Sequence, residues 1–366
     1  MPFTGVQKIE LDGDYGEFSQ CGVCGELFEE EGRCGNCSLI PASDQLMNMI
    51  VDAHYPCDLE ALRQYLPLHV KMTPAFLVSD NMVTAISQRH MNAAVAYART
   101  KASDKPQKDQ IALAIDKLWV LLGKEILNVI PDTGRVSVEV DPRLSFSTEG
   151  SVAKALSLLQ LLEEEGIPKD RVLIELVSTW EGIQAEKELE SVHGVHCNMT
   201  LVYSFVQAAA CAEADLSFIT IPVGDIYDWH VKAFPQMMEN IVGRNDDPGV
   251  VFTQQVFNYY QKFGYRTKIM AASFCNIDQI KGVNGCDVIA ISPELLLDLE
   301  KDMTVVPIAL SVAKAIKSEV SKIEVPKQLL RLWVTEDKKT ADLLSKGILE
   351  LMEEAYRLEQ LVAGKF

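Results

Sequence analysis

The sequence predicts an α/β fold: a (β/α)8 TIM barrel with a small N-terminal four-cysteine zinc ribbon and a long C-terminal helix. The main observation is that eight short apolar runs alternate with longer segments of helical periodicity between residues 46 and 366. Regular alternation over this length favours a closed parallel barrel over an open sheet. Two Cys-x-x-Cys pairs precede the barrel, and residues 338–366 keep helical spacing to the end. We therefore expect two domains, residues 1–45 and 46–366.

The N-terminal cysteines lie in the stretch CGVCGELFEEEGRCGNC, whose spacing allows each pair to aim two thiolates at one ion. We expect Cys21, Cys24, Cys34 and Cys37 to hold one structural Zn²⁺ per chain. Two disulfides or four free thiols are the alternatives. So short a segment with few apolar side chains needs the metal in order to fold. Whether it caps the barrel or docks a protein partner is open at this point.

The barrel elements follow in order along the chain, and each predicted strand leads into a helical segment. The predicted strands span residues 47–53, 69–78, 135–140, 171–177, 197–204, 216–224, 267–273 and 287–292. The predicted helices include residues 81–99, 109–130, 151–166, 247–264, 276–283 and 338–366. No nucleotide-binding glycine motif follows a strand, so we expect no organic cofactor.

Composition limits the partners of this chain. It has 34 basic and 52 acidic residues, a formal net charge of −18. This charge disfavours nucleic acids and anionic membranes, because the interaction with phosphate groups is repulsive. No stretch reaches the ~20 apolar residues that cross a bilayer, and the first residues resemble neither a signal nor a transit peptide. We expect a cytoplasmic protein, or an organellar one if a leader has been removed; a homo-oligomer is left open.

The run RVLIELVSTWEGI, residues 171–183, carries an ionisable group in an otherwise apolar strand. Glu175 has Ile174 before it and Leu176 after it. A buried carboxylate is costly unless it has a partner or a function. Glu175 is therefore a candidate functional residue.

Five multi-residue motifs follow one another along the chain: GRVSVEVDPRLSF (134–146), RVLIELVSTWEGI (171–183), HCNMTLVYSFVQAAACAEAD (196–215), PVGDIYDW (222–229) and GYRTKIMAASFCNI (264–277). They resemble the transaldolases, in the same order and over about residues 46–366. This resemblance implies a class I aldolase-type barrel that moves a three-carbon dihydroxyacetone unit between sugar phosphates through a lysine Schiff base. The zinc ribbon lies outside the resemblance.

The resemblance also implies that the Schiff-base lysine falls at the position of Glu175. A carboxylate cannot attack a carbonyl as an amine does. The phosphate-binding arginines of the family fall at Asp225 and Cys275, neither of which offers a bidentate cationic fork. Thr73 stands where the family has a substrate-contacting asparagine, and Thr220 where it has a serine.

Other family positions are retained in the sequence. By the resemblance, Asp52 matches the acid that handles protons at the substrate hydroxyl, Glu139 the glutamate that activates the catalytic water, and Thr200 the threonine that positions this water. Asn198 matches a substrate-contacting asparagine. Mutual hydrogen bonding inside the barrel is the alternative reason for their retention. Asp141 is expected to pair with Arg143 at the strand end.

Lys71 precedes Thr73 by two residues, so strand alternation places both on the same side. If this side is the interior, Lys71 is within reach of Glu175. Three alternatives remain: a buried ion pair between the two, a Schiff-base amine relocated to Lys71, or no contact.

The substitutions lead us to expect a catalytically inactive member of the family, acting as a scaffold, assembly subunit or regulator with a protein partner. The alternative is a diverged aldolase-type or transaldolase-type enzyme of carbohydrate metabolism, in the pentose phosphate pathway. Such an enzyme uses either Lys71 or carboxylate acid–base chemistry, and its small sugar ligand is left open.

Overall fold

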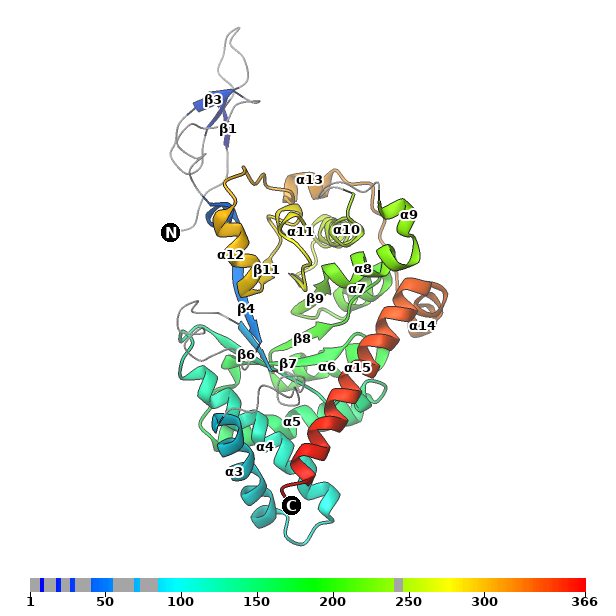
Figure 1. The fold of residues 1–366 in the computed structure, drawn as a ribbon. Helices are drawn as coiled ribbons and strands as arrows, with labels where there is room; N and C mark the ends of the chain where they lie inside the picture. The colour runs from blue at the N-terminus through cyan, green and yellow to red at the C-terminus, as the bar shows by residue number, and fades with distance from the viewer. Residues whose placement is uncertain are drawn as a thin grey trace.

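The strand-forming runs lie side by side in a closed parallel barrel (Figure 1). The structure is a computed structural model, which describes residues 41–54, 69–72, 85–239 and 246–366 and three short strands. For residues 51–54, 69–71 and 85–87 and for the three short strands it describes the backbone alone. Those strands, β1 (Gln7–Ile9), β2 (Phe18–Gln20) and β3 (Leu27–Glu29), form an antiparallel sheet.

The barrel has the strand order β10-β11-β4-β5-β6-β7-β8-β9, so each strand pairs with its neighbours in sequence and β11 closes on β4. All eight predicted strands are confirmed. They are β4 (Met49–His54), β5 (His69–Met72), β6 (Arg135–Glu139), β7 (Val172–Val177), β8 (Cys197–Thr200), β9 (Phe218–Pro222), β10 (Lys268–Ala272) and β11 (Val288–Ile291).

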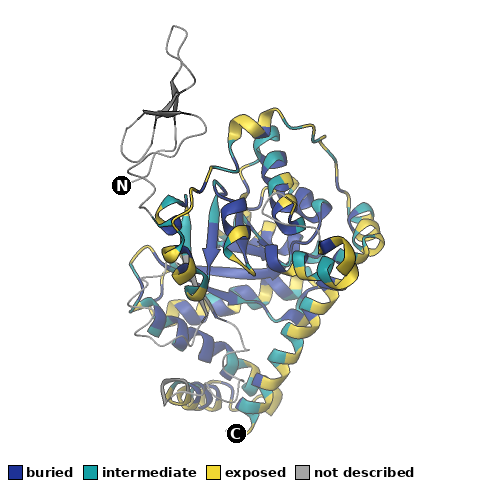
Figure 2. Ribbon diagram, turned by 45° about the horizontal axis from the view of Figure 1, so that its top comes forward, coloured by how far each residue is buried: buried dark blue, intermediate teal, exposed yellow. Residues whose placement is uncertain are grey.

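Helices surround the barrel, and buried residues concentrate on the strands and on the helix faces turned toward them (Figure 2). Asp141 and Pro168 introduce the short helices η3 and η4, and η2 precedes β4. The helices are η2 (Ala42–Gln45), α3 (Ala85–Lys101), α4 (Gln107–Leu127), η3 (Pro142–Leu144), α5 (Thr148–Glu164), η4 (Lys169–Arg171), α6 (Trp180–His193), α7 (Phe205–Glu213), α8 (Val223–Ala233), α9 (Pro235–Met238), α10 (Pro248–Phe263), α11 (Ile277–Gly282), α12 (Pro293–Lys301), α13 (Val312–Ile316), α14 (Lys327–Glu336) and α15 (Lys338–Ala363).

Local sequence explains where these helices begin and end. Thr179 caps α6 by accepting a hydrogen bond from the amide of Gly182, and Gly194 ends the helix in the left-handed conformation. Gly182 is required for another reason: a Cβ there would lie 2.0 Å from the carbonyl oxygen of Val177. The turn from β7 into α6 is therefore held close to the strand end.

The inner face of the barrel is identified by a small apolar cluster separate from the main core. Met270, Ala272 and Ala290 form this cluster, with Ile50 and Val288 packed against it. The residues between them, such as Ile269 and Ala271, belong to the main core between strands and helices. Alternate residues of each strand thus face the interior of the barrel. On the other strands, the residues in register with these inner residues also face the interior.

Two predicted boundaries need correction. The strand predicted over 197–204 ends at Thr200, because Leu201 has a left-handed backbone with φ of 59°. The strand predicted over 69–78 is described only to Met72. No helix in the described part of the chain is long and apolar enough to span a membrane.

Candidate active site

Glu139, Glu175 and Asn198 lie side by side on three neighbouring strands. Glu139 on β6 is in register with Glu175 on β7, which is in register with Asn198 on β8. Residues in register on parallel strands project to the same face. Glu175 and Asn198 are each 2% exposed, while Glu139 is half-buried at the last position of its strand.

The polar row continues to β9. The hydroxyl of Thr220 donates a hydrogen bond to Oδ1 of Asn198 over 2.9 Å. Thr200 is buried at the end of β8, opposite Val177, and its carbonyl accepts from the amide of Ser178. The row therefore presents two carboxyl groups, an amide and a hydroxyl along one arc of the barrel.

Glu139 also lines a cavity of about 60 Å³ at the carboxyl end of β6. This volume holds a few water molecules or a small polar group. Its walls come from α4, α5, η3 and α15 and carry fixed charges. Lys154 pairs with Asp116 over 2.5 Å, and burial raises the pKa of the Asp116 carboxyl despite this partner.

Asp141 pairs with Arg143, as predicted. Their closest oxygen–nitrogen distance is 2.6 Å, and Arg143 reaches Glu359 of α15 over the same distance. The Arg143 guanidinium, assisted by a backbone hydrogen bond, lowers the pKa of Asp141 against the opposing effect of burial. The strand-end loop is thereby tied to the C-terminal helix.

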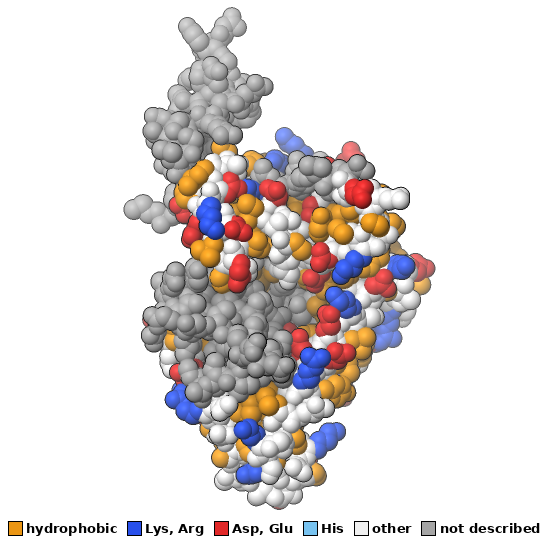
Figure 3. All heavy atoms as spheres, viewed as in Figure 1, with side chains coloured by type: hydrophobic (Ala, Val, Ile, Leu, Met, Phe, Trp, Pro, Cys, Tyr) orange, Lys and Arg blue, Asp and Glu red, His pale blue; other side chains and the backbone are white. Residues whose placement is uncertain are grey.

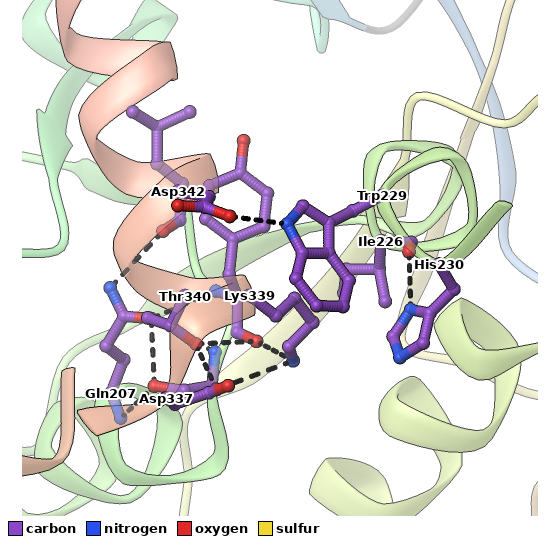
Figure 4. A network of polar contacts seen from close by, with 11 residues as sticks. Gln207, Ile226, Trp229, His230, Asp337, Lys339, Thr340 and Asp342 are labelled. Carbon is purple, nitrogen blue, oxygen red and sulfur yellow. Dashed lines mark hydrogen bonds and ion pairs between the residues drawn. The ribbon is translucent and has the colours of Figure 1, made fainter. Parts of the chain in front are cut away.

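The other end of α15 is held by segments that follow β8 and β9 (Figure 4). Lys339 donates to the carbonyl of Tyr203 over 2.6 Å, and the Trp229 indole donates to Asp342 over 3.1 Å. Burial lowers the pKa of Lys339. Since Arg143, Tyr203 and Trp229 all follow the carboxyl ends of strands, α15 crosses that end of the barrel. Figure 3 shows acidic and basic side chains interspersed along it.

Asp225 and Cys275, at the positions that the resemblance gives to phosphate-binding arginines, lie in acidic surroundings. The Tyr203 hydroxyl donates to Asp225 over 3.1 Å, and the Cys275 thiol lies 3.7 Å from a carboxylate oxygen of Asp228. Burial and the Asp228 carboxylate raise the pKa of Cys275 to about 11. Burial also raises the pKa of Asp225. Neither side chain attracts a phosphate dianion.

For some of the remaining predicted residues the structure describes the backbone alone. The others lie outside the described part of the chain. In the register of the barrel, Asp52 of β4 pairs with His69, and Lys71 of β5 pairs with His54 and Ser137. Their side chains are outside the described part, as are Thr73 and the four zinc-ribbon cysteines, Cys21, Cys24, Cys34 and Cys37. Among the described residues, no group of three or more His, Cys, Asp or Glu is suited to a metal ion.

Sequence reasoning missed Glu186, a fully buried carboxyl group on α6. Neither of its oxygens has a hydrogen-bond partner among the described residues. Burial, and then the negative charges of Glu190 and Glu175, raise its pKa well above the ordinary value. The sequence did hold a signal for its burial: Glu186 is three residues from both Ile183 and Leu189, a spacing that places all three on one face of a helix.

Comparison with known proteins identifies relatives of this chain. Residues 59–362 match the family model described as transaldolase/fructose-6-phosphate aldolase. A transaldolase of Cricetulus griseus is 44% identical over 88% of this chain and 94% of its own length. The Homo sapiens transaldolase is 43% identical over the same shares. A probable transaldolase of Drosophila melanogaster is 43% identical over 83% of this chain and 90% of its own length.

These relatives overturn the expectation of a catalytically inactive scaffold. They carry the name of an enzyme and match most of the chain. The substitutions at Glu175, Asp225 and Cys275 affect only part of the barrel mouth. A barrel mouth draws reactive groups from several strands, so replacing some of them changes the chemistry without removing the capacity for catalysis.

Proposed function

Because this chain belongs to the transaldolase/fructose-6-phosphate aldolase family, we propose that it is an enzyme of carbohydrate metabolism that uses carboxylate acid–base chemistry. The observation that carries the proposal is the register of Glu139 with Glu175 and of Glu175 with Asn198. Two carboxyl groups on neighbouring strands disfavour a state in which both are charged. One proton shared by such a pair supplies an acid and a base in the same place.

The reaction that suits this arrangement is proton transfer beside the carbonyl group of a sugar. One carboxylate removes a proton from the carbinol carbon, while the protonated partner donates to the carbonyl oxygen, and an enediol results. Return of the proton to the neighbouring carbon interconverts ketose and aldose, and the enediol equally adds to a second carbonyl compound. Asn198 and Thr220, joined by their hydrogen bond, are suited to orient the substrate hydroxyl groups.

The substrate end that the resemblance assigns to phosphate faces Asp225, Asp228 and Cys275 here. A carboxylate beside a phosphate dianion is repulsive, so we assign unphosphorylated sugars to this enzyme in place of sugar phosphates. A role in the pentose phosphate pathway itself would require the phosphate group to be held elsewhere. We also propose a cytoplasmic location, since the described cysteines Cys197, Cys211, Cys275 and Cys286 are free thiols.

Borohydride trapping separates this proposal from a relocated Schiff base. The full-length protein is incubated with dihydroxyacetone, fructose and their phosphates, reduced, and read by intact mass. We expect turnover of an unphosphorylated ketose without a covalent adduct. An adduct mapped to Lys71 would contradict the carboxylate mechanism and assign the reaction to that amine, and absence of turnover on every sugar would contradict the proposed function.

A further inference from the structure

A second pocket lies at the opposite end of the barrel from Glu139 and Glu175. Its volume is about 490 Å³, within the range of small-molecule sites. Gln254 and Asn258 of α10 form one wall, the end of α11 another, and the loop 307–310 with Lys314 of α13 the third. The α11 end leads into the amino end of β11, whereas the carboxyl groups of the site lie toward the carboxyl ends of the strands.

The walls of this pocket are rigid because the loop is bound to the start of β11. The carbonyl of Asn284 accepts from the amides of Ala309 and Leu310, over 3.0 and 2.9 Å. Its side chain accepts from the amide of Met47, two residues before β4, and donates to the carbonyl of Pro307. Gly285 has φ of 100°, and a Cβ there would lie 2.3 Å from the Leu310 carbonyl oxygen. The pocket is therefore preformed.

The charged groups at the pocket are basic in a strongly acidic chain. Lys281 is buried and neutralised by Asp302. Against the opposing effect of burial, hydrogen bonds from Lys281 and Thr304 lower the pKa of Asp302 to about 2. Lys314 instead donates to the carbonyls of Ile308 and Ala309, over 3.2 and 3.4 Å. No carboxylate of the described residues lies within ion-pair distance of its ammonium group.

We propose that this pocket binds a small organic phosphate, with the phosphate group at Lys314 and the remainder between Asn258 and the loop. Lysine ammonium groups bind phosphate as point charges. The side chain of Asn258 makes no hydrogen bond within the described part of the chain, so its amide is available to hydroxyl groups of the ligand. The carbonyls of Ile308 and Ala309 hold the ammonium group of Lys314 at the rim of the pocket. A bound phosphate would replace the solvent that contacts this ammonium group. This site lies apart from the carboxyl groups and does not depend on the proposed reaction.

Calorimetric titration of the full-length protein with glucose 6-phosphate tests the site, with glucose and inorganic phosphate as separate probes. We expect saturable binding of one glucose 6-phosphate per chain and weaker binding of inorganic phosphate at this pocket. Any binding of glucose belongs to the barrel mouth and should be unchanged in Lys314→Glu. Lys314→Glu should weaken binding at least tenfold, because a charge-assisted contact is replaced by repulsion. Lys314→Arg should retain most of the affinity.

Lys187→Ala is the matched control, since Lys187 is an exposed lysine on α6 outside the pocket. This variant should bind glucose 6-phosphate with the affinity of the wild type. Circular dichroism establishes that each variant is folded. Two results would overturn the proposal: no saturable binding up to ~10 mM glucose 6-phosphate, or binding of equal strength in Lys314→Glu. The second would place the ligand elsewhere, including at the barrel mouth.

Discussion

Glu175 of β7 stands in register with Glu139 of β6, so two carboxyl groups share one face of neighbouring strands. One of them, Glu175, is only 2% exposed, and the other borders a cavity at the strand ends. The position that the resemblance assigns to an amine is thus part of a carboxylate pair. This relationship underlies the proposed chemistry and the predictions below.

Glu175→Lys alone should not produce dihydroxyacetone transfer between sugar phosphates. The change places an amine in the barrel, but the phosphate end of the substrate still meets Asp225 and Cys275. The Asp225 carboxylate repels phosphate, and the Cys275 thiol supplies no positive charge to bind it. Transfer from fructose 6-phosphate to erythrose 4-phosphate, followed by a coupled assay, measures this. Substantial transfer by the single variant would show that the acidic surroundings of Asp225 do not govern substrate choice.

Glu186→Met should stabilise the protein, and the gain should grow as pH rises. Burial raises the pKa of Glu186 above its ordinary value of 4.5, so the folded state binds its proton more tightly than the unfolded state. The stability contributed by the protonated group is complete below that ordinary value and is lost as pH rises through the raised one. At pH 8 we expect a gain on the order of 1 kcal/mol.

Thermal unfolding of Glu186→Met and wild type between pH 5 and pH 9 measures this effect. Glu188→Gln, at an exposed position of the same helix, is the control and should leave the melting temperature unchanged. A difference in melting temperature that stays constant with pH would show that Glu186 contributes through packing alone.

The four N-terminal cysteines should bind one zinc ion per chain. Cys21, Cys24, Cys34 and Cys37 lie outside the described residues, so this prediction rests on their spacing in the sequence. Elemental analysis of protein purified without chelator measures the metal. Cys21→Ser with Cys24→Ser should reduce zinc below half of the wild-type content, whereas a metal-free protein with two disulfides would refute the assignment.

The barrel was predictable because its signals are local. Eight apolar runs and the helical periodicity between them specify a parallel α/β fold, and alternation along each strand identifies which residues share a face. Glu175 could be named from the sequence as an ionisable residue in an apolar strand, whereas Glu139 and Asn198 were named through the resemblance. The register of the barrel then aligns all three.

What the sequence did not reveal depends on tertiary packing. Glu186 looks like one more acidic residue of a solvated helix until the packing of α6 shows that it is buried. The end of β8 at Thr200 depends on the left-handed backbone of Leu201. The contacts of Arg143 with Glu359 and of Lys339 with Tyr203 join segments far apart in the chain. No local sequence pattern predicts such contacts.

Deuterium exchange into dihydroxyacetone tests the central claim most directly. Proton NMR in D2O follows loss of the carbinol signal with wild type, Glu175→Gln, Glu139→Gln and the surface control Glu188→Gln. The carboxylate account predicts exchange above the buffer rate in wild type and control, and a decrease of at least ~100-fold in each of the other variants. Exchange in Glu175→Gln and Glu139→Gln at the wild-type rate, with both variants folded, would contradict it.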